Sequence, residues 1–215
     1  KLFQLGRKFN ITLHPAFLQP IREAFGGHLS LIICGGAHLS ASIGAEMEAF
    51  GFQIIQGYGI TECSPLLAVN RNKDRRVDTV GHVLPSYKLK LKDGEILVQG
   101  VSLMQGYYKN EELTAAAFHD GWFMTGDLGS LDKNGHLTIT GRKKNLIVFK
   151  NGKKVSPEEI ESYVSSLPLI KEVMAFGLSS SSHADDVRLA LMVYPDPELT
   201  AGMSSYEILE QLQTQ

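Results

Sequence analysis

The chain has 215 residues, of which 43% are hydrophobic and 20% are charged, and this composition is typical of a globular protein with one large or two modest domains. The formal net charge of −2 gives no general attraction to nucleic acid or to an anionic membrane surface. Two cysteines, Cys34 and Cys63, lie far apart without CxxC spacing, so neither a disulfide framework nor a zinc site is predicted, and a reducing, cytoplasmic setting fits best.

The two ends of the sequence fall within helical patterns. The first residues, KLFQLGRKFN, lack both an initiator Met and the apolar core of a signal peptide, and the last, SSYEILEQLQTQ, form an amphipathic pattern. No apolar run approaches the roughly 18 residues that span a bilayer. We therefore expect the C-terminal portion of a longer protein without a transmembrane segment, whose oligomeric state and peripheral membrane contacts stay open.

The first third of the sequence alternates helix and strand signals. Helices are expected over Pro15 to Gly26 and Ser40 to Gly51, with Ser40 or Ser42 as the cap of the second, and each precedes an apolar strand, LSLIICGG or FQII. Tight glycine turns between these elements predict α/β layers around a largely buried, parallel sheet.

Two further textures follow along the chain. Between residues 77 and 141 the short strands YKLKL, EILVQG and HLTITG are separated by the turn sequences KDGE and DKNG, which predicts mainly antiparallel structure. From residue 142 a KNGKK turn, a helix beginning at Ser156 and Pro157, and the strands EVMAFGL and VRLALMVYPD indicate a small α+β unit. We expect a large domain over 1–141, with an α/β part (1–76) and a β part (77–141), and an incomplete small domain over 142–215. SSSS at 179–182 is expected to be a loop tip.

The segment QGYGITEC places Thr61 directly before Glu62, just after a strand that ends in GYG. Glycine allows close approach of backbone to a ligand, a hydroxyl can donate to a phosphate oxygen, and a carboxylate can hold Mg²⁺. The alternative is a turn in which Thr61 caps the next helix and Glu62 is solvated.

Two more segments carry candidate polar residues. Asp127, in GWFMTGDLG, can accept both hydroxyls of a ribose, or can close a β-turn. Arg142, in GRKKNLIVFKNGKKV, can make forked hydrogen bonds to a ribose or phosphate, while the lysines of this segment can belong to a solvated hairpin. The basic run NRNKDRR (70–76) has no interleaved aromatic residues, so an exposed loop explains it better than nucleic-acid binding.

The order of these motifs is more specific than any one of them. GGA (35–37), YGITE (58–62), GWFMTGD (121–127), GRKKNLI (141–147) and VSPEEIE (155–161) together resemble the acyl-adenylate-forming, AMP-binding superfamily, and GRKKN with VSPEEIE is most similar to medium- and long-chain fatty acyl-CoA synthetases. The resemblance runs from about Leu29 to Tyr194. It implies that the β part belongs to a distorted antiparallel β-barrel of the large domain.

The resemblance also implies roles for individual residues. Thr61 would contact the α-phosphate of ATP, and Glu62 would hold Mg²⁺. The adenine pocket would be formed by Gly35, Gly36, Ala37, Tyr58 and Gly59, and the ribose would contact Asp127, Arg142 and Ile139. Lys144 would be the hinge of the small domain, Gly152 would lie along the pantetheine arm of CoA, and Lys153 and Lys154 could meet CoA phosphates.

The implied activity is an ATP-dependent acid–thiol ligation, in which a carboxylate gives an acyl-adenylate and pyrophosphate, and CoA then releases AMP. The substrates are ATP, a carboxylic acid and CoA. The family's Ser/Thr/Gly-rich phosphate loop and its terminal lysine find no counterpart in these 215 residues, so we expect the piece alone to be inactive. Two alternatives stay open, namely a non-catalytic adenylate- or CoA-binding module and a ligase for an aryl or short-chain acid.

Overall fold

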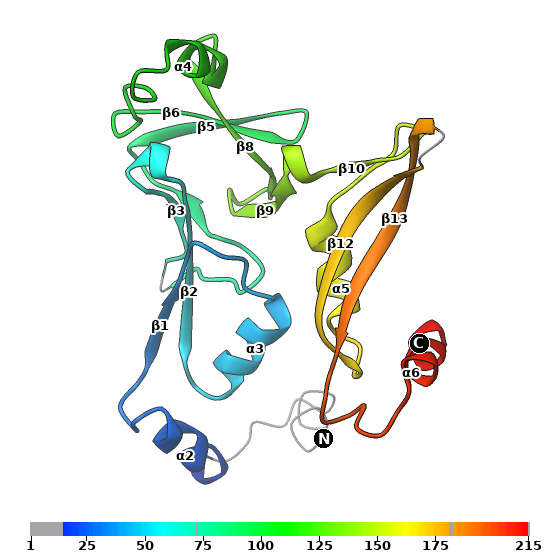
Figure 1. Cartoon of the computed structure of the whole chain (residues 1–215). Helices are drawn as coiled ribbons and strands as arrows, with labels where there is room; N and C mark the ends of the chain where they lie inside the picture. Colours follow the sequence, from blue (N-terminus) through cyan, green and yellow to red (C-terminus); the bar gives the residue numbers. More distant parts are fainter. Residues whose placement is uncertain (1–14, 72, 181–182, 215) are drawn as a thin grey trace. The chain divides into compact units, whose positions relative to one another are not determined.

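The computed structural model describes residues 15–71, 73–180 and 183–214 (Figure 1). The chain forms two compact units, one made of residues 1–88, 100–109 and 131–138, the other of residues 89–99, 110–130 and 139–215. These units interleave along the sequence, and the domain boundary expected after residue 141 stays a prediction.

The first unit alternates helices with strands, as predicted. Its elements are α2 (Pro15–Ala24), β1 (Leu31–Cys34), α3 (Ala41–Ala49), β2 (Gln53–Gly59), the 3₁₀ turn η1 (Thr61–Cys63), β3 (Leu66–Val69) and β4 (His82–Val83). The strands form a sheet in the order β1-β2-β3-β4. Ser40 occupies the N-cap position of α3, but its hydroxyl contacts that of Ser42 at 2.7 Å instead of capping the helix.

The prediction of a parallel sheet holds only for β1 and β2. These two pair in parallel, whereas β2–β3 and β3–β4 are antiparallel. For β2 and β3 the reason is the short connection between Gly59 and Leu66, because a parallel pair needs a crossover of a dozen or more residues. The prediction of a largely buried sheet is wrong for β1, where Ile33 is 71% exposed, and right for β2, where Ile54 is 2% exposed.

A five-stranded sheet follows, and it forms the half-barrel part of the fold. Its strands are β5 (Tyr87–Lys92), β6 (Glu95–Gly100), β7 (Phe118–His119), β8 (Trp122–Leu131) and β9 (Leu137–Arg142), with α4 (Glu111–Ala117) before β7. The order is β5-β6-β8-β7, and β9 also pairs with β8. Ile96, Leu97 and Val98 are fully buried, so both faces of β6 are covered. The KDGE turn has positive φ at Asp93 and Gly94, as a tight hairpin requires.

The C-terminal part of the second unit has the predicted α+β character. It contains η2 (Lys143–Asn145), β10 (Ile147–Val148), β11 (Lys154–Val155), α5 (Pro157–Val164), β12 (Ile170–Ser180), β13 (His183–Pro195) and α6 (Ser205–Gln213). The long strands β12 and β13 form an antiparallel ribbon (yellow and orange in Figure 1), and Glu161 of α5 accepts a hydrogen bond from the backbone of Ala175 at 2.8 Å.

The structure also bears on the serine run at 179–182, on the two cysteines and on membrane-spanning helices. Ser179 and Ser180 belong to β12, so the loop tip expected at 179–182 is wrong for these two, and residues 181–182 lie outside the described residues. Cys34 and Cys63 are free thiols. Within the described ranges, no helix has the length and apolar character needed to cross a membrane.

Candidate functional site

The expected adenine-binding residues meet at one edge of the first unit. Strand β1 pairs with β2 up to Cys34 and Gln56, so Gly35 to Ala37 leave the sheet beside the segment that begins at Gly57. The Cβ position of Gly35 is 3.4 Å from the carbonyl oxygen of Gly57. The carboxyl ends of parallel strands commonly form ligand sites in α/β folds, and the GGA and GYG segments share such an edge here.

Tyr58 lies in β2 opposite Ala68, and the residue is only 9% exposed. Its stacking on adenine stays a prediction. The structure gives Gly59 a reason within the chain, because an added Cβ would lie 2.2 Å from the carbonyl oxygen of Pro65. We expected glycine here to allow a ligand to approach the backbone closely, but at Gly59 it is the backbone of Pro65 that lies this close.

Thr61 and Glu62 form the start of η1. Thr61 is exposed, and Ile60 occupies the N-cap position, so the alternative that Thr61 caps this turn is wrong. Glu62 is half-buried. Its Oε1 accepts a hydrogen bond from the Tyr107 hydroxyl at 3.0 Å, and its backbone oxygen accepts one from the amide of Met104 at 2.8 Å. The alternative of a solvated Glu62 is wrong as well, since the Tyr107 hydroxyl donates a hydrogen bond to the half-buried carboxylate.

Tyr107 is a residue that the sequence reasoning missed. Burial raises the pKa of Tyr107, and the hydrogen bond and negative charge of Glu62 raise it further. The phenol is therefore a stable donor that orients the carboxylate. No local signal in GYYKN indicates this contact, which joins residues 45 positions apart.

Cys63 follows Glu62 but has the properties of a packing residue. It is 1% exposed, and burial, followed by the charge of Glu62, raises the pKa of its thiol to about 11. A neutral, buried thiol is a poor nucleophile. Cys63 therefore offers no covalent chemistry.

The expected ribose-binding residues meet in the second unit. Asp127 lies inside β8, where Leu97 pairs with Met124 and Glu95 with Leu128, so β8 carries extra residues at this point. Gly126 takes a φ of +72°, and the Thr125 hydroxyl donates to the backbone oxygen of Ile96 at 2.8 Å. This bulge redirects the strand at Asp127. The alternative that Asp127 closes a β-turn is wrong.

The Asp127 carboxylate is paired with Arg142. Arg142 Nε lies 2.9 Å from Asp127 Oδ1, and the two side chains are 51% and 4% exposed. The buried carboxylate can accept hydrogen bonds from hydroxyl groups, and the exposed guanidinium beside it can donate hydrogen bonds to oxygen atoms. The structure thus brings together two residues that were predicted to share one ligand.

Lys143, the residue after Arg142, makes a second ion pair in which the lysine side chain is 60% exposed and the carboxylate is buried. Its Nζ lies 2.6 Å from Glu95 Oε2, and the Glu95 side chain is 8% exposed. The sequence reasoning missed this pair, because Glu95 reads as part of the KDGE hairpin. The two pairs connect Arg142, the last residue of β9, to β8, and Lys143, the next residue, to β6.

The other predicted residues of the second unit lie outside these pairs. Ile139 is half-buried in β9, and Lys144 is exposed in η2. Gly152 has a φ of +79° in the exposed turn between β10 and β11. Lys153 and Lys154 are exposed at the same hairpin, as the alternative of a solvated hairpin expects.

Comparison with known families matches two models, the AMP-binding enzyme over residues 7–108 and the AMP-binding enzyme C-terminal domain over residues 144–215. The chain belongs to the AMP-binding enzyme family. This confirms the resemblance to the AMP-binding superfamily that was drawn from the motif order.

Members of the AMP-binding enzyme family with curated names include close sequence relatives. The long-chain-fatty-acid–CoA ligase FadD15 of Mycobacterium tuberculosis is 42% identical over 158 residues, which cover 73% of this chain and 26% of the relative. The long-chain-fatty-acid–CoA ligase of Salmonella typhimurium is 36% identical over 187 residues, covering 80% and 32%. The chain thus spans about a quarter to a third of the length of these relatives.

Solved structures of other proteins share the fold. ATP-bound MatB from Rhodopseudomonas palustris superimposes with a TM-score of 0.76 at 28% identity, covering 96% of this chain and 42% of that one. The anthranilate CoA ligase AuaEII in complex with anthranoyl-AMP gives a TM-score of 0.72 at 26% identity, covering 86% and 37%.

Proposed function

We propose that the chain is part of an ATP-dependent acyl-CoA ligase that activates a long-chain fatty acid as the acyl-adenylate and transfers the acyl group to CoA. The relatives named as long-chain-fatty-acid–CoA ligases, at up to 42% identity, support this acid class. As expected from the sequence, adenylation and thioester formation are proposed for the protein that carries this sequence, in a cytoplasmic setting, and the 215 residues alone are proposed to be inactive.

The contact between Asp127 and Arg142 is the observation that carries the proposal. The bulge in β8 and the guanidinium of Arg142 hold the carboxylate in one place at little exposure. In the proposed function this carboxylate accepts the two ribose hydroxyls of ATP, while Arg142 donates to the ribose oxygens. Fixing the nucleotide in this way reduces the orientational freedom that adenylation must overcome.

Glu62 is the proposed ligand of Mg²⁺. The carboxylate supplies the oxygen ligands that Mg²⁺ prefers, it is half-buried, and Tyr107 fixes its orientation, so the residue fits the ion. When bound, Mg²⁺ neutralises charge on the phosphates of ATP. Thr61 is exposed next to Glu62, where its hydroxyl can donate to the α-phosphate.

Nucleotide binding to the chain itself tests the ribose assignment. In the variant Asp127→Asn the side chain keeps its shape but loses the negative charge and one acceptor oxygen. A hydrogen bond to a charged group contributes about 1.5–3 kcal/mol, so the affinity for AMP should fall by roughly 10- to 100-fold. Isothermal titration calorimetry with AMP measures this loss.

Glu95→Gln is the matched control for this experiment. Glu95 is also a buried carboxylate of the same sheet, and it also pairs with a basic residue of the segment after β9. Both variants should therefore lose comparable stability, whereas only Asp127→Asn should lose AMP affinity. Equal AMP affinity in the two folded variants contradicts the ribose role.

The class of acid is tested separately. In the protein as its gene encodes it, thioester formation should be faster with hexadecanoate than with anthranilate at equal concentration. A preference for anthranilate supports the aryl-acid alternative, to which the structural similarity to an anthranilate CoA ligase points. AMP binding without thioester formation from any acid supports the alternative of a non-catalytic module.

The proposal extends to CoA and to the motion between the two half-reactions. We propose that the pantetheine arm passes Gly152, which is exposed and free of a side chain, and that Lys153 and Lys154 meet the phosphates of CoA. Lys144 is proposed as the hinge, since it lies in a three-residue 3₁₀ turn between β9 and β10. Short segments of this kind absorb domain rotations in few backbone angles.

A further inference from the structure

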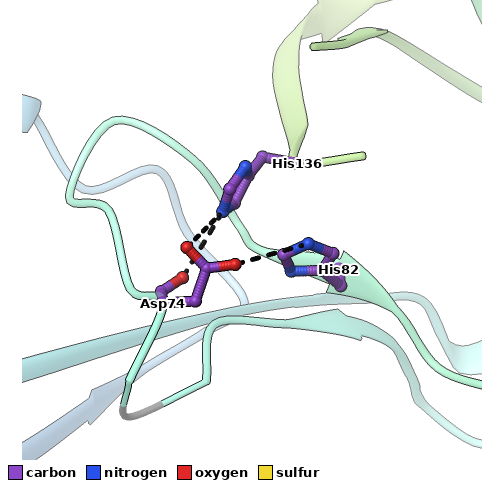
Figure 2. Close-up of side chains that lie close together, drawn as sticks. All are labelled: Asp74, His82 and His136. Atoms are coloured by element: carbon purple, nitrogen blue, oxygen red, sulfur yellow. Dashed lines mark hydrogen bonds and ion pairs between the residues drawn. The ribbon is translucent and has the colours of Figure 1, made fainter. Parts of the chain in front are cut away.

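Two histidines and an aspartate, none of them predicted as site residues, converge in the first unit (Figure 2). Asp74 lies between β3 and β4, His82 begins β4, and His136 lies just before β9. Nε2 of His136 is 3.3 Å from Oδ1 of Asp74, and Nε2 of His82 is 3.6 Å from Oδ2. One ligand atom from each residue lies within 4.8 Å of the other two. The Nε2 atoms of both rings thus contact the carboxylate of Asp74.

His136 is surrounded by more oxygen atoms than one imidazole proton can serve. The side chain is 3% exposed, and its Nδ1 lies 3.2 Å from Oδ2 of Asp132. Its Nε2 faces both Oδ1 and, at 3.4 Å, the backbone oxygen of Asp74. A neutral imidazole has one donor and one acceptor nitrogen, so a proton on Nδ1 leaves a lone pair on Nε2 directed at Asp74. A cation between these atoms converts that repulsion into attraction.

Asp132 sets this orientation. Its Oδ1 accepts hydrogen bonds from the backbone amides of His136 at 2.9 Å and Asn134 at 2.8 Å, and Arg76 lies 3.0 Å from its Oδ2. Carboxylates in this position fix the tautomer of metal-binding histidines and raise their basicity.

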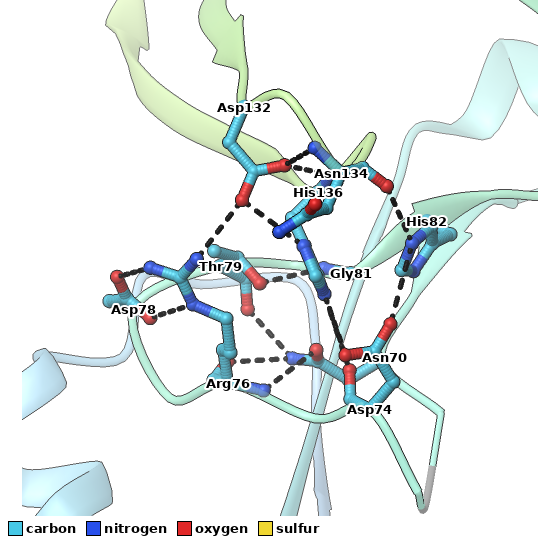
Figure 3. A network of polar contacts seen from close by, with 10 residues as sticks. All are labelled: Asn70, Asp74, Arg76, Asp78, Thr79, Gly81, His82, Asp132, Asn134 and His136. Atoms are coloured by element: carbon cyan, nitrogen blue, oxygen red, sulfur yellow. Dashed lines mark hydrogen bonds and ion pairs between the residues drawn. The ribbon is translucent and has the colours of Figure 1, made fainter.

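The loop that carries Asp74 is held by its own network (Figure 3). Asn70 donates through Nδ2 to the backbone oxygens of Thr79 at 2.7 Å and Arg76 at 3.0 Å, and Arg76 pairs with Asp78 at 2.6 Å. These contacts close the segment between β3 and β4 around Asn70, which is 3% exposed. The loop that carries Asp74 is therefore positioned by contacts other than those with the two histidines.

We propose that Asp74, His82 and His136 bind one divalent first-row transition-metal ion of the zinc class, through a carboxylate oxygen and two Nε2 atoms, with water completing the coordination. Bonds of about 2.0–2.1 Å in a tetrahedral site place neighbouring ligand atoms roughly 3.4 Å apart. Nε2 of His136 lies 3.3 Å from Oδ1 of Asp74 and Nε2 of His82 lies 3.6 Å from Oδ2, so each nitrogen is about one such spacing from a different oxygen of the carboxylate, and the ligand atoms of all three residues lie within 4.8 Å of one another. Imidazole ligands favour zinc, copper or nickel over Mg²⁺ and Ca²⁺. The ion joins the β3–β4 segment, β4 and the turn before β9.

The competing arrangement is one held by protons alone. His82 Nε2 also lies 3.2 Å from the backbone oxygen of Asn134, and His82 Nδ1 is buried without a hydrogen-bond partner. In the metal-bound arrangement, His82 Nε2 gives up its contact with Asn134 and binds the ion instead. The ion is then held by only three protein groups, so the affinity for Zn²⁺ should depend strongly on the Asp74 carboxylate. This difference makes the two arrangements separable by experiment.

The test is metal titration of the 215-residue chain after treatment with a chelator. Calorimetry with ZnCl₂ should give one ion per chain, and Co²⁺ should give the visible absorption of a nitrogen- and oxygen-ligated site. Asp74→Asn and His82→Asn should each lower Zn²⁺ affinity at least about 100-fold, because loss of an outer-sphere partner alone costs roughly 10–100-fold. Asp132→Asn should fall within that smaller range.

His119→Asn is the matched control, since His119 forms an exposed pair with Asp120 at 3.4 Å outside the cluster. It should leave Zn²⁺ affinity unchanged. Asp74 is 59% exposed, so Asp74→Asn is expected to fold, and far-UV circular dichroism checks this. Failure to observe saturable Zn²⁺ binding, binding retained in Asp74→Asn, or a Co²⁺–thiolate charge-transfer band from Cys34 or Cys63 would each overturn the proposal.

Discussion

Gly59→Ala is expected to destabilise the first unit through a backbone clash. The new Cβ would lie 2.2 Å from the carbonyl oxygen of Pro65, 2.8 Å from its carbonyl carbon and 3.0 Å from Cα of Leu66. Backbone atoms cannot rotate away as a side chain can. The Pro65 oxygen is also held by the amide of Ile60 at 2.9 Å, and Leu67, the next residue after Leu66, is fully buried.

The expected loss of stability in Gly59→Ala can be estimated because the neighbouring backbone atoms cannot move away. Inserting a methyl group into a well-packed site costs about 1–3 kcal/mol of the free energy of unfolding. For a chain of 150–250 residues each kcal/mol lowers the melting temperature by about 2–4 °C, so the expected fall is roughly 2–12 °C. Urea unfolding followed by far-UV circular dichroism measures the free energy, and hydrogen exchange of β2 and β3 amides localises the loss.

Gly57→Ala is the control in the same strand. Its Cβ would meet Cδ1 of Leu66 at 3.1 Å, and that side chain is 40% exposed and can move. Alanine also lowers the entropy of the unfolded chain relative to glycine, so Gly57→Ala should remain within about 1 kcal/mol of the parent. If the two variants unfold with equal free energies, the clash at Gly59 does not determine its identity.

Two further predictions concern a charge and a hinge. The pKa of Asp132 is lowered on folding below its ordinary value of 3.8, so its stabilisation is present above that value and is lost as the pH falls through the folded pKa. Urea unfolding should show Asp132→Asn less stable than the parent at neutral pH, with a difference that shrinks as the pH falls below 3.8, and a difference that grows in acid contradicts this. In the protein that carries this sequence, Lys144→Pro should keep adenylate formation but lower transfer to CoA by orders of magnitude, because proline fixes φ near about −65°. Rapid-quench assays of both half-reactions measure this, and equal loss in both is the contrary result.

Much of the fold could be predicted because local patterns determine it. The order of helices and strands, the KDGE hairpin and the α+β texture after residue 142 all follow from periodicity and turn residues within about ten positions. The direction of β3 did not follow from periodicity, which is the same for parallel and antiparallel strands. The connection between Gly59 and Leu66 does predict that β3 runs antiparallel to β2, since it is too short for a crossover.

The candidate site divides in the same way between local and distant information. Asp127 was identified from its motif, but its orientation depends on a bulge, and no local rule gives the register of β8 against β6. Tyr107, Glu95 and the histidine cluster were missed because each contact is made across the fold. His136 reads as a polar residue in a turn, and only closure of the chain brings it to Asp74, 62 positions away. Motifs therefore locate the residues expected to touch a nucleotide, while the groups that orient them, and any site built from unrelated segments, become visible only once strand pairing fixes which turns meet.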